Sequence, residues 1–482
     1  MATDDPVSSS FESRVDEVAL QSPALLKPAL ERGADYAEVF FQQRSATGLR
    51  TSVHAGTTAP RILVSEHLEE GLSIGALDTA QQEMQAVAGW VPGAWQDASL
   101  NVARKFARQK ASPLDSHNID VRIDWLEHMP QDAPCMASVA EKKHLLSTIA
   151  EQVFSYAPEV AQCTIDYRDL SNKSLLLNSE GSAQARASST FGLRLMVDVG
   201  AKSDNKKKRA AYTTLGFRGR FGALAFGLSP YIIEQLVERA HRMKDAREIA
   251  TGHMPVVFAG GSAGLWLHEL VGHLLEADVL PDTLSIGDSL SGAGLTVYDD
   301  ATLSEQMGTY ASDDQGIKGQ RTRLIEKGRI ANVLTDRFYA AQLQQPFTGN
   351  GRRASFTDPP LPRMSNLSMA AGDQAPEDII RSVRHGLYVQ QARAGVHDKG
   401  SREFQLHVAE GYLIKEGRLD QPVCDVLISG NGLTALRQLV AIGNDVSLDQ
   451  GMGQCKKAGQ VVPVSVSTPT VRIDGLQVQQ VT

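Results

Sequence analysis

The sequence predicts an α+β protein with two lobes: an N-terminal α/β lobe, and a C-terminal β-rich lobe that carries a distorted helix with the pattern HExxxH. Helical and strand-like segments alternate up to about residue 250, whereas short β-type segments separated by Gly, Asp and Pro dominate beyond about residue 290. Hydrophobic residues make up 42% of the 482 residues, which is enough for sizeable cores. We therefore expect a polar arm (residues 1–16), an N-terminal α+β domain (17–250) and a C-terminal β-rich domain (251–482).

Three helices are expected in the N-terminal domain. Residues 18–46 begin as a helix and continue as a strand, because the segment YAEVFFQ is rich in β-type residues. Residues 136–157 carry apolar side chains at helical spacing. Residues 229–247 begin with Ser229 and Pro230, which favour the N-cap and the first turn of a helix.

The C-terminal domain opens with a strand, a turn of small residues and a helix, in the segment MPVVFAGGSAGLWLHELVGHLLEADVL. The β-type segments that follow include two expected hairpins, which turn at Lys327-Gly328 and at Glu416-Gly417. A helix is expected in PEDIIRSVRHGL, and a further one is considered in TALRQLVAI.

Charge and composition exclude several classes of protein. The net charge of -8 argues against a protein held on nucleic acid by a basic surface. Four scattered cysteines are too few for a disulfide framework. The acidic start MATDDPVSSS lacks the features of a secretory signal, and no run of apolar residues approaches the length of a membrane span. A cytoplasmic protein without a nucleic-acid or membrane partner is therefore expected.

The hexapeptide His268-Glu269-Leu270-Val271-Gly272-His273 is the segment most suggestive of chemistry. Two imidazoles bind Zn²⁺ well, and a carboxylate next to one of them can take a proton from metal-bound water. A spacing of five, however, separates the two side chains by about 140° on a regular helix, against about 40° for a spacing of four. We therefore predict a π-turn, which aligns residues i and i+5, with the distortion at Gly272. The alternative without a metal site is an ordinary helix with one buried and one surface histidine.

Two residues are candidates to complete the coordination. Glu276 lies three residues after His273, which is a known spacing for metal ligands. Cys455 lies among glycines and is followed by Lys456 and Lys457, and nearby cations favour the thiolate that binds metal. An idle loop thiol is the alternative interpretation of Cys455. A Cys–His nucleophilic pair is another, although it would leave the HExxxH pattern unexplained.

An ordered series of segments spans nearly the whole chain and is densest from 255 to 476. It includes RGADYAEVFF, LLLNSEG, MPVVFAGGSAGLWLHELVGHLLEAD, ASDDQGIKGQ, PFTGNGRR and CKKAGQVVPVSVSTPTVRID. This series resembles the TldD/PmbA family of bacterial and archaeal metalloproteases, and specifically its metal-bearing TldD-type subunit. The resemblance implies Zn²⁺ held by His268, His273 and Cys455, with Glu269 as the general base on zinc-bound water. Glu276 is then expected to support the site from behind the ligands without binding the ion.

The resemblance also implies a function and an assembly. We expect a zinc-dependent hydrolase of peptide or peptide-like amide bonds that acts in a dimeric chamber reached by unfolded or small peptides. The N-terminal domain would build the assembly and the chamber, and the C-terminal domain would carry the metal and the catalysis. The expected partner is a PmbA/TldE-type sister subunit in a heterodimer, and otherwise a second copy in a homodimer.

Two alternatives remain open. Leu274 and Ala277 stand where glycines are common in the family, which suggests a specialised member. The first alternative is therefore a biosynthetic amide hydrolase that trims a small natural-product intermediate. The second is a non-catalytic scaffold subunit of a heterodimer.

Overall fold

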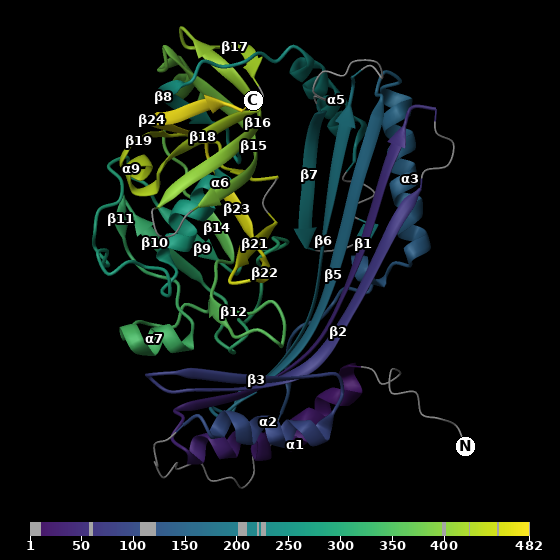
Figure 1. The fold of residues 1–482 in the computed structure, drawn as a ribbon, viewed down its shortest axis with the longest axis vertical. Coiled ribbons are helices and arrows are strands. Elements are labelled where there is room, and N and C mark those ends of the chain that lie inside the picture. The colour runs from purple at the N-terminus through teal and green to yellow at the C-terminus, as the bar shows by residue number, and fades with distance from the viewer. Residues whose placement is uncertain are drawn as a thin grey trace.

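The computed structural model describes residues 11–56, 61–106, 122–200, 210–218, 221–222, 228–397, 402–423, 425–450 and 453–481. These residues form two lobes, which lie side by side in Figure 1. Long strands and their covering helices make the N-terminal lobe, and shorter strands make the C-terminal lobe. The predicted two-lobed α+β fold is confirmed. We propose that the boundary between the domains lies near residues 250 and 251, between the last helix of the first lobe and the first strand of the second.

The N-terminal lobe is built on one seven-stranded sheet with the order β3-β2-β1-β5-β6-β4, and β7 pairs with β6. Neighbouring strands are antiparallel except for β4 and β6, which are parallel. The elements of this lobe are α1 (Phe11–Glu31), β1 (Tyr36–His54), β2 (Ile62–Leu77), β3 (Gln82–Ala88), α2 (Pro92–Ala103), β4 (Asp124–Glu127), η1 (Pro134–Met136), α3 (Val139–Tyr156), β5 (Gln162–Asn178), β6 (Ala183–Asp198), β7 (Ala210–Arg218) and α5 (Pro230–Lys244).

Two pairs of helices cover opposite ends of this sheet, as Figure 1 shows. Helices α1 and α2 pack on one end in a core that includes Phe41 and Trp95, and α3 and α5 pack on the other end in a separate core. One prediction is wrong here: residues 11–16, expected in a polar arm, already belong to α1. The reason is apolar burial, because Phe11 is 1% exposed and stacks on Phe41, and Val15 lies on the same buried face.

The helices predicted at 136–157 and 229–247 are both present, and α3 begins three residues later than predicted. Ser138 caps α3 with a complete capping box, in which Ser138 and Glu141 each accept a hydrogen bond from the other's backbone N–H. Helix α5 begins at Pro230 directly after Ser229, although the Ser229 side chain makes no capping hydrogen bond. The helix-to-strand order predicted for residues 18–46 is also observed, as α1 followed by β1.

The C-terminal lobe contains a six-stranded sheet with the order β11-β10-β9-β14-β23-β20 and a seven-stranded sheet with the order β15-β8-β24-β18-β16-β17, to which β19 adds on β24. An additional pairing of β15 with β16 closes the second sheet on itself. Both predicted hairpins are present, with Glu326 opposite Arg329 and Lys415 opposite Arg418. Residues 327 and 416 adopt the left-handed conformation that such two-residue turns require.

The elements of this lobe are β8 (Gly252–Phe258), α6 (Gly264–Leu267), η2 (His268–Gly272), η3 (His273–Leu275), β9 (Val297–Asp300), β10 (Arg321–Glu326), β11 (Arg329–Ile330), α7 (Arg337–Leu343), β12 (Gly351–Arg352), β13 (Leu361–Pro362), β14 (Asn366–Met369), α8 (Pro376–Arg381), β15 (His385–His397), β16 (Glu403–Lys415), β17 (Arg418–Val423), β18 (Val426–Asn431), α9 (Gly432–Arg437), β19 (Leu439–Ile442), β20 (Ser447–Leu448), β21 (Gln454–Lys457), β22 (Gln460–Pro463), β23 (Ser465–Thr468) and β24 (Val471–Gln480).

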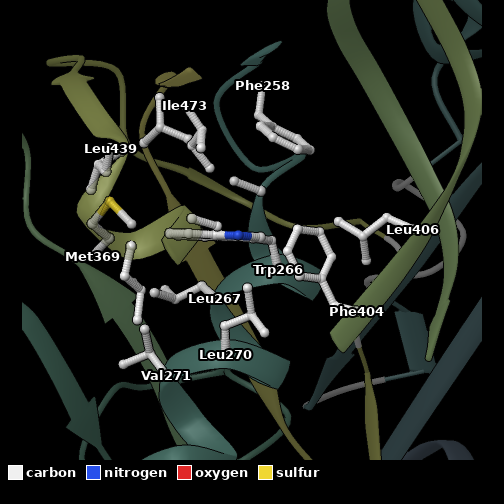
Figure 2. Close-up of a cluster of buried hydrophobic side chains, with 14 of the residues drawn as sticks. Phe258, Trp266, Leu267, Leu270, Val271, Met369, Phe404, Leu406, Leu439 and Ile473 are labelled. Carbon is white, nitrogen blue, oxygen red and sulfur yellow. The ribbon is translucent and has the colours of Figure 1, made fainter. Parts of the chain in front are cut away.

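The core of the C-terminal lobe surrounds the short helix α6. Trp266 on this helix is fully buried, and Figure 2 shows it among Phe258, Leu270, Phe404 and other apolar side chains from several strands. Burying an aromatic side chain of this size is among the largest contributions a single residue makes to a core. The core therefore fixes the helix that leads directly into His268.

The two lobes meet along a polar seam. Arg353 of the C-terminal lobe is buried and ion-paired with Glu38 on β1, and Arg337 makes two hydrogen bonds to Glu180 in the turn after β5. Phe356 adds an apolar contact with the first lobe. In the part of the chain that the structure describes, no helix is long and apolar enough to cross a membrane.

Candidate metal centre

The HExxxH segment contains the predicted π-turn. Residues His268–Gly272 form a π-helical segment that continues α6, and the backbone N–H of His273 donates to the carbonyl of His268, five residues earlier. A 3₁₀ turn follows at His273–Leu275. The extra residue is therefore absorbed within one turn, which brings residues i and i+5 onto the same side of the segment.

Gly272 lies within this turn, as predicted, but conformation is not the reason for a glycine there. Its φ of -57° is open to any residue. A Cβ at this position would lie 1.9 Å from Met364 Sδ and 3.2 Å from Leu367 Cδ2. Met364 and Leu367 therefore pack so closely against this backbone that a side chain here would require them to shift.

The π-turn places the two histidines together. The rings of His268 and His273 lie with their centroids 4.8 Å apart and at 79° to each other, and both residues are buried. Cys455 joins them from the other end of the domain, 182 residues after His273. Ligand atoms of these three side chains lie within 4.8 Å of one another, and Cys455 Sγ is 3.4 Å from His273 Nε2.

Cys455 lies on a strand and not in a loop. It belongs to β21, which forms a two-stranded hairpin with β22, and it is 1% exposed despite its glycine and lysine neighbours. The alternation of the strand explains this burial, because Cys455 and Lys457 point to the covered face while Gln454 and Lys456 are exposed. The backbone is held as well, since Arg363 Nη2 donates to the carbonyl of Cys455 at 2.8 Å.

The surroundings of the Cys455 sulfur favour the thiolate, which is the form that binds a cation. Burial opposes ionisation, but hydrogen bonds with His268 and His273 outweigh it and lower the pKa of the Cys455 thiol to about 5. Burial likewise disfavours the charged form of His273, yet the Glu276 carboxylate and the Cys455 sulfur raise its pKa to about 10. A buried thiolate beside a protonated His273 is therefore the charge state that these contacts favour near neutral pH, and a cation bound to the sulfur would take the place of that proton.

Glu276 lies behind His273. Its Oε2 accepts a hydrogen bond from His273 Nδ1 at 2.7 Å, so that Nε2 of the same ring faces Cys455. Burial raises the pKa of Glu276, but the charges and hydrogen bonds of His273 and Lys457 prevail and lower it to about 2. A carboxylate that orients an imidazole in this way is common behind metal-binding histidines.

Glu269 sits at the rim of this cluster. It follows His268 within the π-turn and is half-buried, whereas His268, His273 and Cys455 are buried. Among the described residues, none makes a hydrogen bond or an ion pair with its carboxylate. A partly exposed acid that follows a buried candidate ligand in the sequence has the solvent access that proton exchange requires.

Three residues near the site were not predicted. Lys457 contacts Glu276, and Asp278 accepts a second bond from the same ammonium. Arg363, completely buried, holds the backbone of Cys455. Only Lys457 carried a signal in the sequence, because it stands two residues after Cys455 and thus on the same face of a strand.

The donor set fits a zinc ion. Two imidazoles and a thiolate are the soft and borderline ligands that Zn²⁺ takes in proteins, and three protein ligands leave one position for water or substrate. His268 Nδ1 is buried and has no hydrogen-bond partner among the described residues, so this imidazole retains binding capacity that the protein itself does not use.

The comparisons with known proteins agree with this description. A family model of the PmbA/TldA metallopeptidase C-terminal domain matches residues 251–480. The chain is 36% identical to a metalloprotease TldD homolog of Buchnera aphidicola over 253 residues, and the alignment spans about half of either protein, 52% of each. It is 33% identical to a metalloprotease of Methanothermobacter thermautotrophicus over 349 residues, which cover 71% of this chain and 74% of that protein. A zinc metalloprotease TldD homolog of Saccharolobus solfataricus is 26% identical over 461 residues, 94% of this chain and 98% of the relative.

Two solved structures share the fold. A proposed modulator of DNA gyrase from Thermotoga maritima has a TM-score of 0.72 at 18% identity, covering 98% of this chain and all of the other. TldE from Thermococcus kodakarensis has a TM-score of 0.68 at 15% identity, covering 96% of this chain and 99% of the other.

Proposed function

Because the chain belongs to the PmbA/TldD family, we propose that it is a zinc-dependent hydrolase of peptide or peptide-like amide bonds. The observation that carries this proposal is the convergence of His268, His273 and Cys455, whose ligand atoms meet within 4.8 Å in a buried cluster. Relatives described as metalloproteases, one of them as a zinc metalloprotease, support both the ion and the reaction.

In this proposal His268, His273 and Cys455 hold the ion, and Glu269 carries the proton. Zinc in such a site supplies a Lewis acid for the amide carbonyl and for water. Glu269 is the general base that accepts a proton from the attacking water and returns it to the leaving amine. Glu276 keeps His273 in the tautomer that leaves Nε2 free to bind.

A nucleophilic role for Cys455 is less consistent with the geometry. Its sulfur lies 3.4 Å from His273 Nε2, as in a nucleophile–base pair, but the residue is only 1% exposed. A nucleophile must reach the carbonyl that it attacks. Burial between two imidazoles favours a ligand.

Elemental analysis of the purified chain tests the metal assignment. We expect about one zinc per chain, because an imidazole–thiolate site of this kind binds zinc tightly. The double variant Cys455→Ser, His273→Ala should lose it. Near-stoichiometric zinc in that double variant would refute the ligand assignment.

The first alternative, a biosynthetic amide hydrolase that trims a small natural-product intermediate, shares the same site. Assaying a peptide library beside amide intermediates of small natural products separates the two functions. Cleavage of unstructured peptides generally supports the peptidase, and turnover confined to one intermediate supports the alternative. The scaffold alternative predicts no turnover at all, and the complete set of ligands and base argues against it.

We further propose that the active form is a dimer with a metal-less PmbA/TldE-type sister, and that the N-terminal lobes build its chamber. The fold shared with TldE supports this assembly. Light scattering of the chain alone and with the sister, combined with activity, is the test. A fully active monomer would contradict the chamber, and a fully active homodimer would remove the need for a sister.

A further inference from the structure

The Lys457 ammonium is buried and fully hydrogen-bonded. Its Nζ donates to Glu276 Oε2 at 2.8 Å, to Asp278 Oδ1 at 2.6 Å and to the carbonyl of Pro362 at 2.9 Å. An ammonium has three N–H donors, so these acceptors saturate it. A charged group with all its donors engaged in a buried setting is fixed in position.

These contacts connect the two halves of the candidate metal centre. Lys457 follows Cys455 by two residues on β21, so both side chains lie on the covered face of the strand. Glu276 follows His273 by three residues and bonds its ring at 2.7 Å. A closed ring of contacts therefore runs from Cys455 along the strand to Lys457, then to Glu276, to His273 and back to Cys455.

The hairpin that carries Cys455 depends on side chains for its placement. Among the described residues, β21 and β22 form a sheet of their own and pair with no other strand. Their two-residue turn places Ala458 and Gly459 at positive φ. Without a larger sheet to fix its orientation, such a hairpin depends on packing and side-chain contacts, and those of Lys457 and Arg363 act on the strand that carries the thiolate.

Charge gives the same contact a second role. Glu276 is completely buried, and an unpaired carboxylate in that position would be strongly destabilising. One oxygen, Oε2, accepts from both Lys457 and His273. The ammonium thus allows Glu276 to stay ionised while it orients the His273 ring.

We propose that Lys457 is a positioning residue that holds the Cys455 strand against His273 through Glu276 and thereby sets the metal affinity of the site. This inference rests on the proposed zinc site. It assigns no contact between Lys457 and the substrate or the ion.

Lys456 provides a matched control, because it is the same residue type one position earlier but points to solvent. Lys457→Met and Lys456→Met are purified without metal and titrated with Zn²⁺ against a chromophoric chelator. We expect Lys457→Met to bind zinc about 10–100-fold more weakly, in the range found when groups that orient metal ligands are removed. Lys456→Met should match the unchanged chain.

Substitution with Co²⁺ adds a readout that a general loss of stability does not move. The unchanged chain and Lys456→Met should show the same thiolate-to-cobalt charge-transfer absorption, and Lys457→Met should show it weakened or shifted. Equal zinc affinity and an equal spectrum in Lys457→Met and Lys456→Met would overturn the inference while leaving the zinc site intact. If the unchanged chain binds neither ion, the proposed function fails and the inference with it.

A second comparison covers the case in which Lys457→Met does not fold. Glu276→Gln removes the buried carboxylate charge and keeps an oxygen that accepts a hydrogen bond from His273 Nδ1. The double variant that combines Lys457→Met with Glu276→Gln therefore leaves no unpaired charge at position 276. Against Glu276→Gln alone, this double variant should still bind zinc more weakly, because the hairpin has lost its anchor. Equal zinc affinities of the double variant and of Glu276→Gln would overturn the inference.

Discussion

The substitution Gly272→Ala tests whether packing is what selects the glycine of the π-turn. Two effects oppose each other. Alanine is the better helix former, by about 1 kcal/mol. The new Cβ, however, would lie 1.9 Å from Met364 Sδ and 3.0 Å from Met364 Cε, and Met364 is completely buried. Overpacking of this kind costs about 1–3 kcal/mol.

The clash should prevail, so we expect Gly272→Ala to lose up to about 2 kcal/mol of unfolding free energy. Because the backbone that moves also carries His273, zinc affinity should fall about tenfold or more. The measurements are denaturant unfolding of the metal-free chain and zinc competition with a chelator. Gly93 in α2 is the matched control: it is helical, a Cβ there meets nothing within 4 Å, and Gly93→Ala should stabilise the protein.

A second substitution identifies the cause. Met364→Ala removes both atoms that clash, and it should restore part of the zinc affinity when it is added to Gly272→Ala. A Gly272→Ala protein that is more stable than the unchanged chain and binds zinc equally well would refute the packing argument. So would a double variant that behaves as the plain sum of its two substitutions.

Three further outcomes are expected. Glu269→Gln should keep its zinc and lose turnover by about 10²–10⁴-fold, and either a loss of zinc or unchanged turnover in that variant contradicts its role as base. Burial raises the pKa of Asp336 to about 7 from its ordinary 3.8, so ionisation of this acid destabilises the fold as pH rises from 3.8 towards 7 and above. Asp336→Asn should therefore raise the free energy of unfolding by roughly 1–4 kcal/mol near pH 8 and leave it unchanged below about pH 4. Denaturant unfolding at both pH values is the measurement, and a pH-independent effect would count against the prediction. Ser138→Ala removes the capping box of α3 and should cost about 1 kcal/mol of unfolding free energy, an expectation that fails if the midpoint of unfolding is unchanged.

Local signals in the sequence predicted the elements that are decided locally. Pro230 and the turns at Lys327-Gly328 and Glu416-Gly417 act through the residues next to them, and the structure has the expected helix start and hairpins at these positions. The π-turn was predictable for a similar reason, because the five-residue spacing of two histidines is compatible with one metal only if the helix is rewound.

Features that depend on tertiary packing could not be predicted from such local signals. Residues 11–16 look polar, yet Phe11 stacks on the ring of Phe41 in β1, a long-range contact that no local sequence pattern predicts. The contact of Lys457 with Glu276 joins residues 181 positions apart. Arg363, which lies between β13 and β14, donates a hydrogen bond to the backbone of Cys455. Strand alternation identifies the side of β21 on which Lys457 lies, but not what covers that side.

The π-turn also shows how a helix tolerates an inserted residue. A regular helix with a four-residue spacing and a π-turn with a five-residue spacing present their histidines to the same side, so one amino acid gained or lost between them is compensated by the backbone alone. A search for metal sites by spacing should therefore accept both lengths. For the longer one it should also ask whether the surrounding packing admits the bulge, and in this chain a glycine backbone lies against a buried methionine there.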